Sequence, residues 1–169
     1  MKKLLLSTVF YFAVCQNMLF GQIDSKMYNM MLKTLLSHTV TEVSVEETLA
    51  MDSVVFLDAR ERIEYQVSHI EEAIWIGYND FDATRVAEVD KDAEIVVYCS
   101  VGYRSEKITE KLINLGYTNV CNLYGGIFEW VNQGQVVVVK EQEPTDKVHA
   151  FDKVWGVWLN IPKENKIYN

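Results

Sequence analysis

The sequence predicts an α/β fold of three layers, in which a central parallel sheet of about five strands is covered by helices on both faces. The first observation is that short apolar runs rich in β-branched residues alternate along the chain with segments of helical spacing. The second is the largely apolar run at 94–98, which is typical of a strand buried in a parallel sheet. Strands joined through helices in this way pair through right-handed crossovers.

The first half of the chain supplies three of the predicted strands. A helix is predicted over 25–37, and a short strand over 39–43 follows it. Ser44 then caps a short helix, because Glu47 stands three residues later and completes a capping box. The helix over 25–37 carries an apolar stripe that we expect to pack in a core rather than form a Met-rich binding surface. The stripe consists of Met27, Met30, Met31, Leu35 and Leu36. The remaining elements of this half are strands over 54–58 and 73–76 and a loose helix over 82–89.

The second half supplies the other two strands, over 94–98 and 119–123. Between them, a helix over 104–115 has apolar residues at helical spacing. It ends at Gly116, where a glycine commonly follows the last helical residue. A final helix over 127–132 follows a pair of glycines.

The first 21 residues have the form of a secretion signal. Lys2 and Lys3 precede an apolar stretch over 4–20, and Gly21 is the expected last residue before cleavage. An uncleaved signal anchor is the alternative, although two polar residues interrupt the stretch. We therefore expect a bacterial protein that is exported, with the periplasm as its destination and no stable membrane span after cleavage.

One domain with extensions is expected at this length. The predicted parts are the signal peptide over 1–21, a helical extension over 22–38, the domain over 39–134 and a C-terminal extension over 135–169. We expect the C-terminal extension to fold back on the domain and to contain an edge strand over 136–139. Its aromatic stretch is predicted to present one helical face, for which a partner-binding patch is the alternative. That face consists of Phe151, Val154, Trp155 and Trp158.

The net charge of −8 argues against binding to nucleic acid or to acidic membranes. Removal of the leader with its two lysines brings the charge to about −10. No metal site is expected, because the three histidines are scattered and no Cys-x-x-Cys pair occurs. We also expect no cofactor.

The candidate site lies where the fourth predicted strand ends and a tight loop leads into a helix. Cys99 occupies this strand end, and ligand sites in open α/β sheets lie beyond such ends. Loop amides and a helix N-terminus together form an anion site, which favours a thiolate nucleophile. Gly102 lets the loop curl, Arg104 adds a positive charge, and Ser105 can cap the helix or donate to an anion. The alternative is that Cys99 is a small buried hydrophobic residue.

A disulfide between Cys99 and Cys121 is the other use for the loop cysteine in an exported protein. Cys121 lies inside the predicted strand over 119–123, and a bridge would consume the loop thiol. We therefore interpret Cys121 as a core residue.

The loop 99–105, Cys-Ser-Val-Gly-Tyr-Arg-Ser, resembles the active-site loop of rhodanese domains with its Cys-x-x-Gly-x-Arg pattern. Three further segments resemble motifs of that family in the same order along the chain. They are 56–60 (strand, Asp, x, Arg), 68–73 (Gly-His-Ile-x-Gly-Ala) and 123–130 (Gly-Gly…Trp). The resemblance covers about 41–133. Ser68 and Glu72 stand where the family has glycines, which leaves the geometry of that turn open.

The resemblance implies a rhodanese-like fold and a sulfurtransferase without a cofactor. Cys99 would take sulfur from thiosulfate or a similar small anionic donor as a persulfide and pass it to a thiol or to cyanide. A protein sulfur acceptor is a further partner class. The substrate-binding residues that the resemblance implies are Ser100, Val101, Gly102, Tyr103, Arg104 and Ser105. Asp58 and Arg60 would form an ion pair that supports the site, and His69 would be a structural turn residue remote from the thiol.

Two other function classes remain as alternatives. Related cysteine phosphatases and arsenate reductases place five residues between Cys and Arg, whereas four separate Cys99 from Arg104, and Tyr98 rather than His precedes the cysteine. The tighter loop suits sulfur better than phosphate. A rhodanese-like binding module or sulfur carrier that serves a protein partner is the second alternative, because the fold does not determine which of these the chain is.

Overall fold

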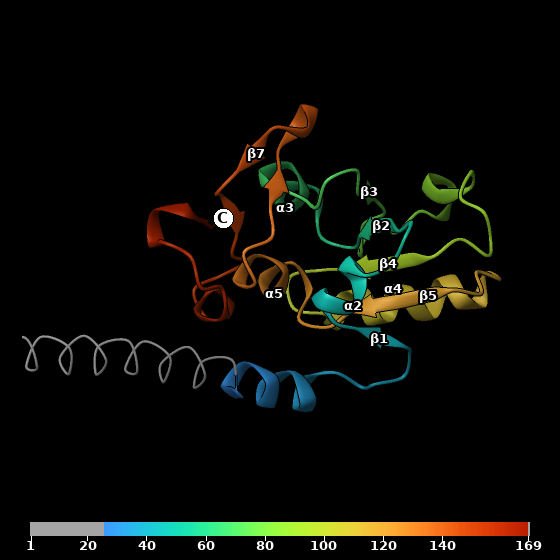
Figure 1. Ribbon diagram of the computed structural model, residues 1–169, viewed down its shortest axis with the longest axis horizontal. Helices are drawn as coiled ribbons and strands as arrows, with labels where there is room; N and C mark the ends of the chain where they lie inside the picture. The colour runs from blue at the N-terminus through green and yellow to red at the C-terminus, as the bar shows by residue number, and fades with distance from the viewer. Residues whose placement is uncertain (1–25, 169) are drawn as a thin grey trace, which may run out of the picture. The chain divides into compact units, whose positions relative to one another are not determined.

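The computed structural model of the protein describes residues 26–168 (Figure 1). Contacts within the chain define two units, of which the first ends at Thr34 and the second begins at Leu35. The predicted signal peptide, residues 1–21, lies outside the described residues. Within residues 26–168, no helix has both the length and the apolar character that crossing a membrane requires.

The described part of the first unit is helical. The helix extends over 26–35, which confirms the predicted helix for these residues but ends it two residues earlier. Met27 and Met30 are 54% and 70% exposed, so the expected packing of the whole methionine stripe in a core is wrong. The buried positions in this stretch are Tyr28, Leu32 and Leu36, of which only Leu36 belongs to the predicted stripe. They recur at every fourth residue, so the buried face is rotated relative to the predicted stripe.

The second unit contains a five-stranded sheet with the order β1-β5-β4-β2-β3, and every strand pair is parallel, which confirms the predicted fold class. The strands are β1 (Glu42–Val43), β2 (Val55–Asp58), β3 (Ile74–Trp75), β4 (Ile95–Tyr98) and β5 (Val120–Leu123). Asp58 at the end of β2 lies opposite Tyr98 at the end of β4. The carboxyl ends of these two central strands are therefore level, and the loops that follow them emerge at the same edge.

Helices connect these strands. They are α2 (Val45–Leu49), α3 (Arg62–Val67), the 3₁₀ turn η1 (Ala83–Val86), α4 (Tyr103–Asn114) and α5 (Gly126–Asn132). The predicted capping box of α2 is confirmed, since the Ser44 hydroxyl accepts from the Glu47 amide at 3.1 Å and the Glu47 carboxylate accepts from the Ser44 amide at 2.8 Å. The loose helix predicted over 82–89 is confirmed only as the single turn η1, for which Asp82 is the N-cap.

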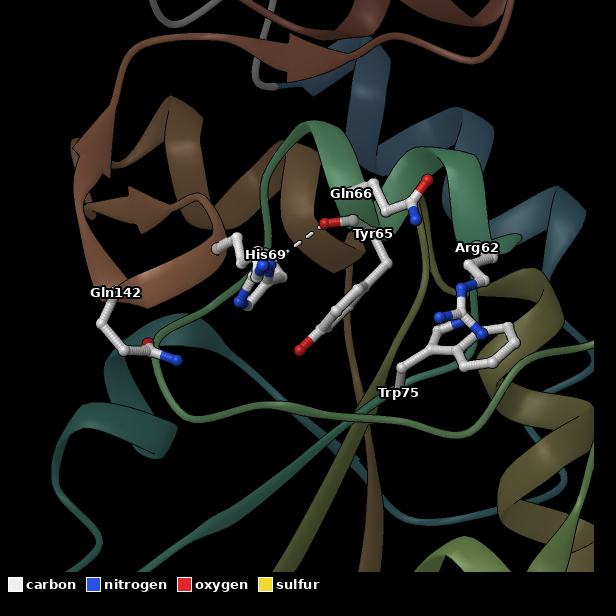
Figure 2. A pocket seen from close by; sticks show the side chains of 7 residues that line it. Arg62, Tyr65, Gln66, His69, Trp75 and Gln142 are labelled. Atoms are coloured by element: carbon white, nitrogen blue, oxygen red, sulfur yellow. Dashed lines mark hydrogen bonds between the residues drawn. The ribbon is translucent and has the colours of Figure 1, made fainter.

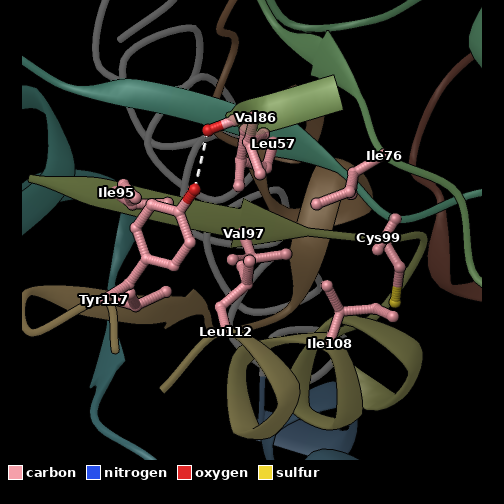
Figure 3. Packing of buried hydrophobic residues seen from close by; sticks show 11 residues of the cluster. Leu57, Ile76, Val86, Ile95, Val97, Cys99, Ile108, Leu112 and Tyr117 are labelled. Atoms are coloured by element: carbon pink, nitrogen blue, oxygen red, sulfur yellow. Dashed lines mark hydrogen bonds between the residues drawn. The ribbon is translucent and has the colours of Figure 1, made fainter. Parts of the chain in front are cut away.

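Side chains of β4 alternate between two covered faces of the sheet. Val97 points toward α4 and packs in a buried cluster that also contains Ile108 and, at its edge, Cys99 (Figure 3). On the other face, Phe56 of β2 meets Trp130 of α5 edge-on, with ring centroids 5.5 Å apart. All four residues of β4 are buried, as expected for a strand that is covered on both sides.

Residues 135–168 form short elements outside the central sheet. They are β6 (Val137–Val138), η2 (Lys140–Gln142), β7 (Pro144–Thr145), β8 (Val148–His149), η3 (Trp155–Trp158), η4 (Lys163–Asn165) and β9 (Lys166–Ile167). The strand predicted over 136–139 is present as β6, but it pairs with β7 and does not add an edge to the central sheet. The backbone of Val138 is already occupied, since it exchanges two hydrogen bonds of 2.8 and 2.9 Å with His69.

The shared helical face predicted for the aromatic stretch is also wrong. Phe151 has φ of +64°, in the left-handed region, which prevents a regular helix from passing through it. The Asp152 carboxylate then accepts the amides of Val154 and Trp155 at 2.8 and 2.9 Å, and only one 3₁₀ turn, η3, follows. The four side chains therefore do not lie on one helix.

The C-terminal extension returns to the domain through α5. The Asn132 side chain donates to the Trp158 carbonyl at 2.9 Å and accepts from the Asn160 amide at 2.7 Å. One side chain at the end of α5 thus holds the segment that carries the aromatic residues.

Candidate active site

Cys99 follows β4 directly, at the carboxyl end of the sheet. Its Sγ accepts a hydrogen bond from the Gly102 amide at 3.1 Å, across a loop in which Gly102 has φ of +108°. Only glycine adopts such an angle without strain, which explains the glycine at this position. Cys99 is 1% exposed, and it lines a cavity of about 220 Å³. The sulfur is therefore not enclosed by hydrocarbon alone.

The carbonyls of the loop are held by the start of α5. The amides of Ile127 and Phe128 donate to the carbonyls of Cys99 and Ser100 at 2.9 and 3.1 Å. A Cβ on Gly126 would lie 2.3 Å from the Cys99 carbonyl oxygen, so the backbones approach as closely as glycine permits. These helix amides bind loop carbonyls and are not directed at the sulfur.

A second set of contacts holds the Gly102 carbonyl. It accepts from the Asn122 side-chain amide at 3.0 Å and from the Ser105 hydroxyl at 3.1 Å. Ser105 is fully buried, so it secures the first turn of α4 and does not reach the cavity as a donor to an anion. The loop is thus a rigid support for the thiol.

Arg104 is paired with a residue that sequence analysis missed. Its guanidinium donates to both carboxylate oxygens of Glu64 in α3, at 2.7 and 2.8 Å, and to the Ser100 hydroxyl at 3.0 Å. Ser100 in turn donates to Glu64 at 3.0 Å. The sequence predicts that Arg104 adds a positive charge for an anionic donor. In the structure, the Glu64 carboxylate already compensates this charge.

The directions in which the pKa values of Glu64 and Arg104 shift agree with a tight ion pair between them. Burial alone would raise the pKa of Glu64, but the hydrogen bonds and charge of Arg104, helped by Arg60, lower it to about 2. Burial alone would lower the pKa of Arg104, but the Glu64 hydrogen bonds and the negative charges of Cys99 and Glu64 raise it above its usual value. Arg104 thus lies within electrostatic range of the Cys99 sulfur.

Asp58 and Arg60 form the expected ion pair at the end of β2. The guanidinium is fully buried and contacts the carboxylate at 2.6 Å. It also donates to the Ser68 carbonyl at 2.6 Å, which ties the loop after β2 to the end of α3. Its Nη1 is buried with no hydrogen-bond partner in the described part of the chain. The hydrogen bonds of the pair hold the loop after β2 and the end of α3, so its role is to orient neighbouring loops.

The cavity over Cys99 is lined mainly by apolar and aromatic side chains. Val101 of the loop is buried and Tyr103 is 42% exposed. Phe151 and Trp155 of the C-terminal extension complete the wall together with Leu35. The sequence predicts only that these two aromatic residues share a helical face. Nothing local indicates that they lie beside Cys99, because more than 50 residues separate them from it.

His69 lines a different pocket, of about 470 Å³, shown in Figure 2. Its ring stacks on Tyr65 with centroids 4.0 Å apart, and its Nδ1 pairs with the Tyr65 carbonyl. Burial lowers the pKa of His69. Trp75 and Arg62, which lies over the indole at 5.2 Å, form the other end of this pocket. None of the predicted site residues lines it.

Cys99 and Cys121 are both free. Cys121 is only partly buried, so the structure places this expected core residue at the margin of the core. Burial, followed by the charges of Glu94 and Glu47, raises the pKa of the Cys121 thiol and disfavours its thiolate.

Known proteins resemble the chain over the region that contains this site. The sequence matches the family described as Rhodanese-like domain over residues 41–133. A tRNA uridine(34) hydroxylase of Erwinia tasmaniensis is 37% identical over 86 residues, which cover 48% of this chain and 25% of that protein. The chain therefore spans about a quarter of the length of that relative.

Two solved structures are similar to the fold. A rhodanese-related protein of Thermoplasma volcanium has a TM-score of 0.51 at 26% identity, over 59% of this chain and 99% of that one. A thiosulfate sulfurtransferase of Pseudomonas aeruginosa has a TM-score of 0.54 at 24% identity, over 83% of this chain and 25% of that one. The second likeness concerns the fold alone.

Proposed function

We propose that the chain, which belongs to the family of rhodanese-like domains, is a sulfurtransferase. The reaction would pass through a persulfide on Cys99. The observation that supports this most is the position of the sulfur. Sγ accepts from the Gly102 amide, and Cys99 lines a cavity at the carboxyl end of β4. A thiolate in this position has a donor for its charge and space in front of it for a small substrate.

The reaction would proceed in two displacements. The Cys99 thiolate attacks the outer sulfur of the donor, a new S–S bond forms, and the leaving group departs with the electron pair of the broken bond. With thiosulfate the leaving group is sulfite, and Cys99 carries a persulfide anion. A thiolate or cyanide then attacks the terminal sulfur, and the Cys99 thiolate is restored. The Gly102 amide would stabilise negative charge on the sulfur of Cys99 in both steps.

Replacement of the nucleophile tests the proposal. Cys99→Ser should lower the formation of thiocyanate from thiosulfate and cyanide by more than about 10³-fold, because the covalent route is lost. The matched control is Cys121→Ser, which should retain activity because this thiol lies on β5, outside the cavity lining. After donor treatment without acceptor, mass spectrometry should find one added sulfur on the Cys99 peptide. A label on Cys121 alone would refute the assignment.

A sulfur carrier or binding module is the alternative use of the same site. A carrier would form the Cys99 persulfide but release it slowly to small acceptors and rapidly to one protein. Comparison of the rate of persulfide formation with steady-state turnover separates these functions. Turnover much slower than loading with every small acceptor would favour the carrier.

The relative from Erwinia tasmaniensis suggests tRNA modification as another candidate. One property of this chain counts against it. Its net charge of −8 opposes binding to phosphate backbones. Binding of tRNA at low salt, measured by gel shift, would revive this candidate.

We further propose that residues 1–21 direct export to the periplasm of a bacterium. The two lysines and the apolar stretch that follows support this. If cleavage occurs after Gly21, intact mass measurement of the protein from the periplasmic fraction should give a chain that begins at Gln22. Recovery of the full-length chain in the membrane fraction would favour the signal anchor.

A further inference from the structure

We infer that the Cys99 site selects a singly charged sulfur donor with an apolar substituent over inorganic thiosulfate, and that Phe151 and Trp155 determine this preference. The inference rests on the proposed sulfurtransferase function and specifies its substrate class. It departs from the sequence-based expectation of a small dianion. Three features of the cavity carry it.

The first feature is charge. Among the residues of the described range 26–168 that line the cavity, Arg104 is the only basic one. Both of its terminal nitrogens are engaged by Glu64, at 2.7 and 2.8 Å, inside the protein. A thiolate on Cys99 adds a further negative charge to the site. A dianionic donor would therefore find no uncompensated positive charge to attract it. The Cys99 thiolate would repel a singly charged donor only about half as strongly as a dianion.

The second feature is the wall. The lining residues beyond the loop are Leu35, Phe151 and Trp155, and Val101 and Tyr103 add further hydrocarbon. The cavity measures about 220 Å³. An apolar protein cavity of about 150 Å³ already holds benzene, so an aryl group fits here next to the reacting sulfur. Thiosulfate has no apolar surface with which to use this wall.

The third feature is that the wall is fixed in place. The Phe151 amide donates to Nδ1 of His149 at 3.1 Å, and the Arg104 guanidinium lies 5.3 Å from the centroid of the Phe151 ring. The Trp155 amide donates to Asp152 at 2.9 Å. Both aromatic residues come from the C-terminal extension, outside the matched range 41–133. The apolar part of the donor preference would thus be a property of this chain's extension rather than of the loop.

The chemistry is the same for all donors. A thiosulfonate, R–SO₂–S⁻, reacts with the Cys99 thiolate to give the Cys99 persulfide anion and the sulfinate R–SO₂⁻. One S–S bond forms, one S–S bond breaks, and the sulfinate leaves with the electron pair. The total charge is −2 before and after the step.

Three donors separate charge from apolar contact. They are thiosulfate, methanethiosulfonate and benzenethiosulfonate, measured as kcat/KM with cyanide as the acceptor and normalised to their rates with a free thiol. Benzenethiosulfonate should exceed methanethiosulfonate by about tenfold, the effect of a modest apolar contact, and both should exceed thiosulfate. Equal or better normalised use of thiosulfate by the wild-type protein would overturn the inference, even if every variant failed to fold.

Variants test the residues. Phe151→Ala and Trp155→Ala should each lower the benzene-to-methane ratio several-fold. The matched control is Val154→Ala, which changes a side chain that is 72% exposed between the two and should leave the ratio unchanged. Glu64→Gln should raise the use of thiosulfate relative to methanethiosulfonate several-fold, because it frees the charge of Arg104. Unchanged ratios in folded variants, checked by circular dichroism, would refute these roles.

Failure of this inference differs from failure of the proposed function. If no donor places sulfur on Cys99, the sulfurtransferase proposal itself is wrong. If thiosulfate loads Cys99 as well as the thiosulfonates do, the function stands and only the substrate class is wrong.

Discussion

At the residue scale, the charge of Arg104 is governed by its partner on another helix. The Cys-x-x-Gly-x-Arg spacing predicts that Arg104 follows Cys99 into the helix, and it does. The spacing carries no information about Glu64, which lies 40 residues earlier and yet binds the guanidinium with two hydrogen bonds. Glu64 stands three residues after Glu61, and the two form the capping box of α3. This local role is enough to explain Glu64 from the sequence, so nothing in the sequence points to its contact with Arg104.

The Arg104–Glu64 pair predicts a pH dependence of stability. The pKa of Glu64 is lowered from 4.5 to about 2 in the folded protein, so its contribution is complete above about pH 4.5 and is lost as the pH falls toward 2. It amounts to about 3 kcal/mol at neutral pH. Urea unfolding of the wild type and of Glu64→Gln should differ by a constant free energy above pH 5, and the difference should shrink below pH 4.5. A difference that is independent of pH down to 2.5 would contradict the pairing.

At the element scale, the helices and strands that depend on residues close together in the sequence were predicted correctly. The capping box at Ser44 and the five strand positions were predictable, because caps and apolar runs depend on residues that are neighbours in sequence. The stretch 151–158 was not, since its apolar spacing suits a helix. A left-handed Phe151 and a side-chain turn at Asp152 override that spacing. The placement of the stretch over Cys99 then depends on tertiary contacts alone.

The start of α5 gives a prediction about two glycines. Gly126→Ala should destabilise the protein by more than about 3 kcal/mol, because its Cβ would meet the carbonyl of Cys99 at 2.3 Å in addition to the strain at φ of +58°. Gly116→Ala is the matched control. It also has a positive φ, +90°, but no atom lies within 4 Å of the new Cβ, so the cost should be about 1 kcal/mol. Denaturant unfolding measures both, and equal costs would show that the close approach is not important.

At the scale of the whole molecule, the C-terminal extension contributes to the cavity although it lies outside the matched domain. Asn132 holds it through hydrogen bonds to the backbone of Trp158 and Asn160.

Asn132→Ala should therefore loosen residues 150–162 and lower the free energy of unfolding by about 1–2 kcal/mol, the usual effect of lost side-chain hydrogen bonds. Hydrogen exchange should show faster exchange there, with the central sheet unchanged. The neighbouring Gln133→Ala, which removes only an exposed contact to Glu129, should leave exchange unaltered. Uniform loosening of the sheet would argue against this role.

The two hydrogen bonds from the start of α5 to the carbonyls of Cys99 and Ser100 also affect the order of events during folding. The loop residues are synthesised more than 20 residues before the helix that fixes them. Until that helix has docked, the carbonyls of Cys99 and Ser100 lack these two hydrogen bonds. We therefore expect the loop to reach its folded geometry late, after the chain as far as α5 has been made.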